Sequence, residues 1–98
     1  MGYKLVILPR AQQEIIEAFD YYNKISRTVL EAFNTDLEDV YQSLEKNPFY
    51  HLKYKNLRGI PFKKFPFLIF FSVEEAEKKV YIYSVFHTSQ NPESYPNR

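Results

Sequence analysis

The sequence predicts an α+β domain in which two N-terminal helices pack on one face of a small, mainly antiparallel, twisted sheet. Three observations lead to this prediction. A short apolar segment opens the chain, two segments of helical periodicity follow it, and aromatic and β-branched residues fill the last third. The expected order of elements is β-α-α-β-β-β.

The first expected elements are a strand over residues 3–8 and two helices. Pro9 ends the strand, and proline is well tolerated in the first turn of a helix. Ser26 is the candidate N-cap between the helices, and Pro48 ends the second helix. A short link favours an antiparallel hairpin. Apolar residues recur at helical spacing in both segments: Ala11, Ile15, Phe19 and Tyr22, then Leu30, Phe33, Leu37, Val40, Tyr41 and Leu44.

The remaining strands are expected over residues 57–62, 67–73 and 80–87. Residues 49–56 have no clear period and are interpreted as a loop. Pro61 removes a backbone donor, so its strand should lie at an edge or be interrupted. Residues 74–79 connect the last two strands, and residues 88–98 are expected to be irregular.

Length and composition restrict the class of protein. The 98 residues suffice for one domain, 1–98. Cysteine is absent, and His51 and His87 lack the spacing of a zinc site, so we expect neither a metal nor another cofactor. No secretory signal is visible, and no apolar run approaches the ~18 residues that span a bilayer. A cytoplasmic location without membrane contact is therefore expected.

Charge is unevenly distributed although the formal net charge is only +1. Residues 11–47 carry eight acidic and three basic side chains, whereas residues 48–73 carry no acidic side chain. The second segment has five basic residues: Lys53, Lys55, Arg58, Lys63 and Lys64. Cations interleaved with aromatic rings suit a polyanion. The alternative is ordinary solvated charge on an edge strand.

His87 ends the last expected strand and is the main candidate for proton transfer. Simple alternation places it on one face with Tyr81, Tyr83 and Val85, without deciding which face meets the helices. It could act as a general acid or base, or bind phosphate when protonated. The alternative is a histidine hydrogen-bonded to the tail backbone. With only two glycines in the chain, no phosphate-cradling loop can form.

The order of several short motifs resembles the RelE/ParE toxins of bacterial type II toxin–antitoxin systems. The resemblance covers nearly the whole chain and implies a growth-inhibiting toxin that a cognate antitoxin neutralises by wrapping a helix or strand around it. It rests on Tyr3-Lys4-Leu5-Val6, Ala11, Tyr21-Tyr22, Asn47-Pro48, Arg58, Phe65-Pro66-Phe67, His87 and Asn91-Pro92.

The resemblance implies two possible targets. RelE-like members cleave mRNA in the ribosome, and we favour this hypothesis because His87 coexists with the basic segment. ParE-like members inhibit DNA gyrase without catalytic residues, which is one alternative; a non-toxic antitoxin-binding module and a general RNA binder are others. For mRNA cleavage the catalytic residues would be His87 and Arg58, with RNA bound by Lys53, Lys55, Lys63, Lys64, Gln90, Tyr95 and Arg98.

Overall fold

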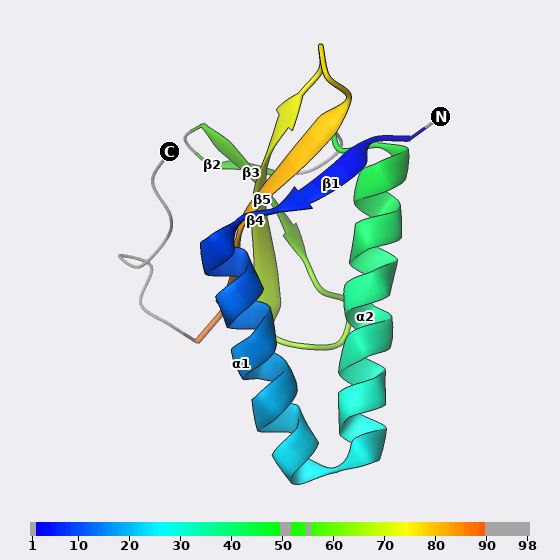
Figure 1. The fold of residues 1–98 in the computed structure, drawn as a ribbon, viewed down its shortest axis with the longest axis vertical. Helices are drawn as coiled ribbons and strands as arrows, with labels where there is room; N and C mark the ends of the chain where they lie inside the picture. The colour runs from blue at the N-terminus through cyan, green and yellow to red at the C-terminus, as the bar shows by residue number, and fades with distance from the viewer. Residues whose placement is uncertain (1, 50–51, 55, 90–98) are drawn as a thin grey trace.

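Two helices cover one face of a five-stranded sheet in the computed structural model, which describes residues 2–49, 52–54 and 56–89 (Figure 1). The α+β class and the two helices on one face are confirmed. The elements are β1 (Lys4–Ile7), α1 (Pro9–Ile25), α2 (Arg27–Lys46), β2 (Leu52–Tyr54), β3 (Leu57–Pro61), β4 (Phe67–Glu74) and β5 (Lys79–His87).

The strands follow the order β1-β5-β4-β3-β2. β1 pairs with β5 in parallel and every other neighbouring pair is antiparallel, as expected for a mainly antiparallel sheet. β2 is an additional strand in a segment that we interpreted as a loop. It has three residues, too few to produce a recognisable alternation, and pairs with β3 only as far as Gly59. Pro61 lies beyond this pairing, where the strand has an open edge.

A single residue separates the two helices. The Ser26 N–H donates to the Tyr22 carbonyl at the end of α1, and its Oγ accepts from the Val29 N–H at the start of α2 (3.1 and 3.0 Å). Ser26 has extended backbone angles, so one residue reverses the chain and serves both helix ends. The predicted N-cap is confirmed.

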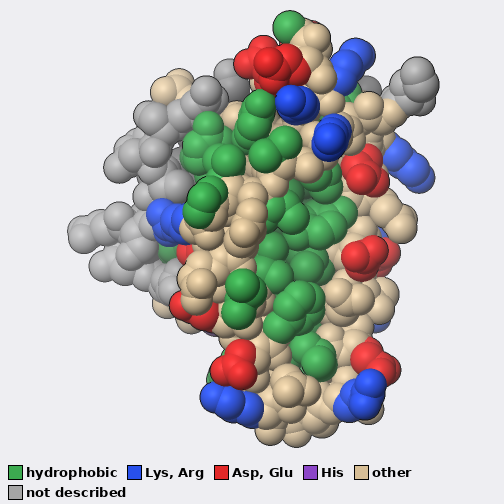
Figure 2. Space-filling model, in the orientation of Figure 1, with side chains coloured by type: hydrophobic (Ala, Val, Ile, Leu, Met, Phe, Trp, Pro, Cys, Tyr) green, Lys and Arg blue, Asp and Glu red, His purple; other side chains and the backbone are tan. Residues whose placement is uncertain are grey.

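The main core lies between the helices and the sheet, and Phe33 is at its centre. This ring is fully buried, and five other rings lie 5.1–5.7 Å from it, centroid to centroid. They are Phe19, Tyr22, Phe62, Phe65 and Phe67. Three of the five pairs are edge-to-face, one is stacked and one is tilted, and aromatic packing of this kind stabilises a small domain beyond simple area burial. Figure 2 shows a band of apolar side chains along the seam between the helices.

A smaller apolar cluster lies on the opposite face of the sheet. Leu57, Phe70 and Phe86 are each no more than 1% exposed there, and Leu68 and Tyr83 pack against them. β4 is therefore apolar on both of its faces, which explains the continuous run of apolar residues in its sequence.

Asp36 is a buried carboxylate that holds the loop between β3 and β4 against α2. Its Oδ1 accepts from the Lys63 N–H at 3.1 Å, and its Oδ2 accepts from the Lys64 and Phe65 N–H groups at 2.8 and 2.9 Å. Only 3% of Asp36 is exposed. Three backbone N–H donors replace the hydrogen bonds to water that the carboxylate loses when it is buried. The loop therefore has a fixed position relative to α2.

We predict that Asp36→Asn destabilises the protein by about 2–3 kcal/mol, because a neutral amide offers one acceptor oxygen where the carboxylate offers two charged ones. Urea unfolding measures the change. Asp39→Asn, at an exposed position on the same helix, is the matched control and should stay within about 0.5 kcal/mol of the parent protein. Equal losses for the two variants would contradict the role of the three hydrogen bonds.

A second prediction concerns alkaline stability. Burial, with a contribution from Glu38, raises the pKa of Tyr41 from 10.0 to about 12. The unfolded chain therefore loses this proton first, so the associated stability is present below pH 10 and disappears as the pH rises towards 12. The free energy of unfolding should fall less steeply over this window in Tyr41→Phe than in the parent. Parallel curves would refute the prediction.

Candidate functional site

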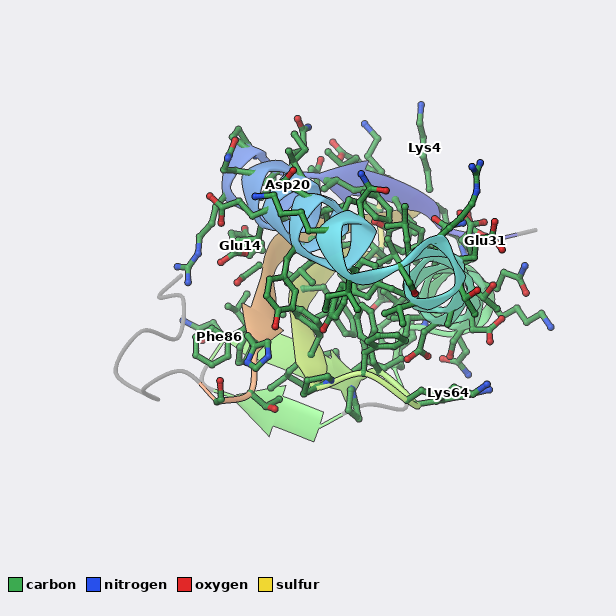
Figure 3. All side chains as sticks on the ribbon, turned by 90° about the horizontal axis from the view of Figure 1, so that it is seen from below. Lys4, Glu14, Asp20, Glu31, Lys64 and Phe86 are labelled. Atoms are coloured by element: carbon green, nitrogen blue, oxygen red, sulfur yellow. The ribbon has the colours of Figure 1, made fainter. Side chains whose placement is uncertain are left out.

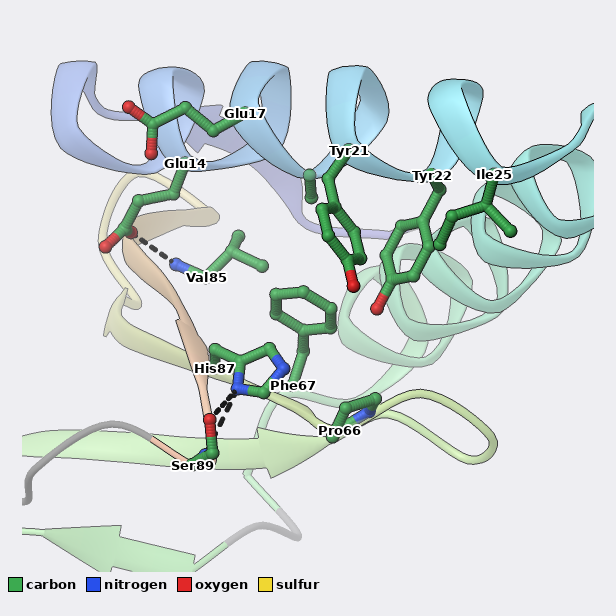
Figure 4. A pocket seen from close by; sticks show the side chains of 11 residues that line it. Glu14, Glu17, Tyr21, Tyr22, Ile25, Pro66, Phe67, Val85, His87 and Ser89 are labelled. Carbon is green, nitrogen blue, oxygen red and sulfur yellow. Dashed lines mark hydrogen bonds between the residues drawn. The ribbon is translucent and has the colours of Figure 1, made fainter.

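A cavity of about 640 Å³ lies between α1 and the C-terminal half of β5, and we call it the α1–β5 groove (Figure 4). One wall is a face of α1, because its lining residues recur every three or four positions. The groove is lined by Glu14, Glu17, Ala18, Tyr21, Tyr22 and Ile25 on α1, and by Pro66, Phe67, Val85, His87 and Ser89.

His87 lies in this groove and is half-buried. Its ring packs edge-on against Phe67, with 5.0 Å between centroids. Its Nδ1 accepts the Ser89 backbone N–H at 3.2 Å and lies 2.6 Å from the Ser89 Oγ. Because a backbone N–H can only donate, the neutral imidazole carries its proton on Nε2. A hydrogen bond to the backbone that follows the strand is the structural role that the sequence left as an alternative.

A bulge in β5 decides which face His87 occupies. Phe70 lies opposite Ser84 and Phe71 opposite Ile82, so Tyr83 is an extra residue in the ladder. The bulge shifts the alternation, and Val85 shares the helix-facing core with Ile82. His87 therefore faces α1, whereas Tyr83 packs on the opposite face. The predicted grouping of Tyr83 with His87 is wrong because a bulge leaves no clear signal in the local sequence.

Glu14 connects α1 to β5 beside the bulge. Its Oε1 accepts from the Ser84 Oγ at 2.8 Å and from the Val85 N–H at 2.9 Å, and its Oε2 accepts from the Arg10 Nε at 3.2 Å. Sequence reasoning missed this residue. Its partners on β5 lie 70 and 71 positions away, so no spacing rule within the helix could identify them.

The tyrosines of α1 supply both apolar surface and hydroxyl groups to the groove. Figure 4 shows Tyr21 and Tyr22 extending from α1 towards Phe67 and His87. Burial, with a smaller contribution from Tyr21, raises the pKa of Tyr22, so its hydroxyl stays neutral at ordinary pH. Among the described residues that line the groove, Glu14 and Glu17 are the charged ones, and Glu14 is ion-paired with Arg10 at 3.2 Å.

Arg58 lies elsewhere on the sheet. It pairs with Phe71, whereas His87 pairs with Phe67, so the two sites are four residues apart along β4, or about 13 Å at roughly 3.3 Å per residue. Its Nη1 donates to the Phe49 carbonyl at 3.0 Å, and its guanidinium lies 5.4 Å from the centre of the Phe49 ring. Arg58 therefore fastens the segment after α2 to the sheet.

Lys63 and Lys64 lie on the loop that Asp36 holds, on the α2 side of the molecule. Both are exposed and line a separate, smaller cavity that also includes Asp36 and Asp39. Figure 3 shows Lys64 directed outwards, well apart from Glu14 beside α1. The aromatic rings of the main core occupy the space between the two sides. The structure therefore does not bring these lysines to the imidazole.

Other predicted RNA-binding residues lie partly or wholly outside the described part of the chain. Lys53 is in β2, with its Cα opposite that of Arg58, but its side chain is not described. Lys55, Gln90, Tyr95 and Arg98 lie outside the described residues. Their assignment stays a prediction.

Residues 2–49, 52–54 and 56–89 are the part of the chain that the structure describes. Within these ranges no three or more His, Cys, Asp or Glu side chains gather closely enough to hold a metal ion. Neither described helix combines the length and apolar character needed to cross a bilayer.

Comparisons with known proteins identify the class. Residues 5–92 match the family described as the ParE toxin of the type II toxin–antitoxin system parDE. The fold is similar to a structure from the chromosomal ParDE system of P. aeruginosa, with a TM-score of 0.71, 16% identity, and coverage of 87% of this chain and 95% of that one. It is also similar to the isolated E. coli RelE toxin, with a TM-score of 0.52, 19% identity, and coverage of 93% and 89%.

No curated protein sequence matches the chain significantly. The fold is that of the RelE/ParE toxins, and the family match extends over most of the chain. The chain belongs to the ParE toxin family of type II toxin–antitoxin systems. The expected family and the expected antitoxin partner are thereby confirmed, whereas the molecular target is a separate question.

We predict that nitrogen NMR shifts will identify the neutral His87 ring as the form protonated at Nε2, because Nδ1 accepts from Ser89. Ser89→Ala keeps the backbone donor and removes the hydroxyl, so the same tautomer should remain dominant. A ring protonated mainly at Nδ1 in the parent protein would contradict the geometry.

Proposed function

We propose that this toxin inhibits DNA gyrase by binding it and carries no catalytic site for RNA cleavage. The observation that supports this proposal most directly is the separation of His87 from Arg58, Lys63 and Lys64. Arg58 is held at Phe49, and Lys63 and Lys64 extend from the α2 side. Among the described residues, the groove around the imidazole is lined by two glutamates, of which Glu14 is ion-paired with Arg10 at 3.2 Å.

Cleavage of mRNA would need a different distribution of charge. Attack of a 2′-hydroxyl on the neighbouring phosphorus builds up negative charge on the phosphate oxygens, and fixed donors or cations must stabilise it. Of the two carboxylates that line the groove, Glu14 is ion-paired with Arg10, and the negative charge of Glu17 would repel the RNA backbone. A proton-transferring histidine without nearby cations supplies only part of the required chemistry.

The comparisons support the same choice. The matched family is that of the ParE toxin, and one of the similar structures comes from a ParDE system. ParE-like toxins, as the resemblance implied, inhibit gyrase without catalytic residues. RelE-like cleavage of mRNA remains the competing hypothesis, because the chain also shares its fold with the E. coli RelE toxin.

The test compares both activities of one purified sample. We expect the toxin to inhibit supercoiling by gyrase and to leave mRNA intact on programmed ribosomes. His87→Ala should change gyrase inhibition by no more than about 3-fold, since no proton transfer is involved. Growth arrest on induced expression separates an active toxin from a non-toxic module.

Cut mRNA would overturn the proposal, particularly if His87→Ala reduced cutting by roughly 10²-fold or more. In that case Glu17→Gln, which removes a negative charge from the groove, should increase the cutting. An absence of both activities together with normal growth would favour the antitoxin-binding module.

A further inference from the structure

We propose that the α1–β5 groove binds a small molecule that combines a planar aromatic ring, a hydrogen-bond acceptor and a cationic amine. This inference goes beyond the proposed function, because it holds for either target, gyrase or mRNA. The residues that carry it are Tyr22, His87 and Glu17, whose polar groups line the groove together with apolar side chains.

Tyr22 presents a buried hydroxyl to the groove. Only 8% of the residue is exposed, and within the part of the chain that the structure describes its Oη takes part in no hydrogen bond. A buried tyrosine hydroxyl usually has a partner, because an unsatisfied polar group raises the free energy of the folded state. Figure 4 shows this hydroxyl directed away from α1 into the groove. An acceptor atom of a bound molecule would satisfy it.

The position of this hydroxyl is fixed by the aromatic core. The Tyr22 ring lies 5.1 Å from both Phe33 and Phe65, centroid to centroid, and 6.3 Å from Phe67. With rings on several sides, the side chain cannot swing its oxygen out to solvent. The hydroxyl is therefore held in place before a ligand arrives, which reduces the entropy lost on binding.

His87 supplies a second donor to the same groove. Its Nδ1 accepts from the Ser89 N–H, so the neutral ring carries its proton on Nε2. Among the described residues Nε2 has no hydrogen-bond partner. Burial raises the pKa of Tyr22, so its hydroxyl also keeps its proton at ordinary pH. Two donors without protein partners favour a ligand with a carbonyl or phenol oxygen.

The walls of the groove are apolar and suit a flat ring. Ala18, Phe67 and Val85 lie among the lining residues, and Tyr21 and Ile25 remain 61% and 55% exposed beside them. The volume of about 640 Å³ lies within the range of roughly 300–1,000 Å³ that is usual for small-molecule sites. An aromatic ring placed here would cover apolar surface that α1 leaves in contact with solvent.

Glu17 determines the charge of the expected ligand. The other lining carboxylate, Glu14, is ion-paired with Arg10. Glu17 accepts from the Gln13 amide at 3.2 Å and has no ion pair among the described residues. It precedes Tyr22 by five residues on α1, or about 7.5 Å at roughly 1.5 Å per residue. A phenol with a short amine chain can therefore place its oxygen near Tyr22 and its ammonium near Glu17.

NMR titration of the full-length toxin with three matched probes tests the site. Tyramine has the ring, the phenol oxygen and the ammonium group. Phenethylamine lacks the oxygen, and 3-(4-hydroxyphenyl)propionate replaces the ammonium by a carboxylate. Tyramine should bind with a Kd at or below about 1 mM and shift the amide signals of lining residues such as Ala18 and Val85. The other two probes should bind at least about 3-fold more weakly.

Tyr22→Phe removes the hydroxyl and keeps the ring. It should weaken tyramine binding by about 5-fold and leave phenethylamine binding within about 2-fold. Because the hydroxyl has no partner among the described residues, the melting temperature should change by less than about 3 °C. Tyr41→Phe, on α2 outside the groove lining, is the matched control and should leave tyramine binding unchanged.

Glu17→Gln tests the charge preference separately. It should weaken tyramine binding by about 3-fold and reduce the discrimination against the propionate probe, because the ammonium loses its attraction and the carboxylate its repulsion. Glu31→Gln, at an exposed position on α2, removes the same charge outside the groove and should have no effect on either probe.

Several results would overturn the proposal. They are the absence of saturable shifts with any probe up to about 10 mM, equal affinity for all three probes, and equal effects of Tyr22→Phe and Tyr41→Phe. Shifts that depend on protein concentration without a probe would assign the groove to a second copy of the chain. Neither gyrase inhibition nor mRNA cleavage enters these measurements, so a negative result here leaves the proposed function standing.

Discussion

The structure depends on carboxylates of the helices that accept hydrogen bonds from backbone N–H groups of the sheet and of the loop between β3 and β4. Asp36 on α2 accepts three such groups from the loop before β4, and Glu14 on α1 accepts one from β5. Each contact satisfies donors that the sheet itself leaves unpaired, and buried donors without partners would be costly. The helices are therefore positioned on the sheet by polar contacts at two sites as well as by the aromatic core.

These two contacts also divide the surface of the molecule. Asp36 fixes the loop whose lysines extend on the α2 side, and Glu14 marks the end of the groove on the α1 side. The aromatic cluster around Phe33 lies between them. A protein with little net charge thus presents Arg58, Lys63 and Lys64 away from its imidazole, and the distribution of charge over the surface matters more for binding than the overall composition.

Beyond Ile82, β5 has no strand paired to it on the β1 side among the described residues, and most sheets cover or shorten such an unpaired edge. Open edges invite pairing with other chains, and proteins commonly cover or charge them. Here the Glu14 carboxylate accepts one of the donors on this edge, the Val85 N–H.

Sequence alone determined the class, the helical hairpin and most strands, because these depend on local periodicity and on punctuating residues such as Ser26 and Pro48. The sequence also sufficed for the family assignment, because the order of several short motifs is recognisable even where overall sequence identity is low.

Only the tertiary structure decided where the charged groups and His87 lie. The bulge at Tyr83 reversed the expected alternation, and β2 was too short to produce a pattern. Glu14 and Asp36 acquire their roles from partners at least 27 positions away. The basic residues that cluster in the sequence therefore do not gather around His87. β-Sheet register and helix packing, rather than distance along the sequence, determine which side chains meet.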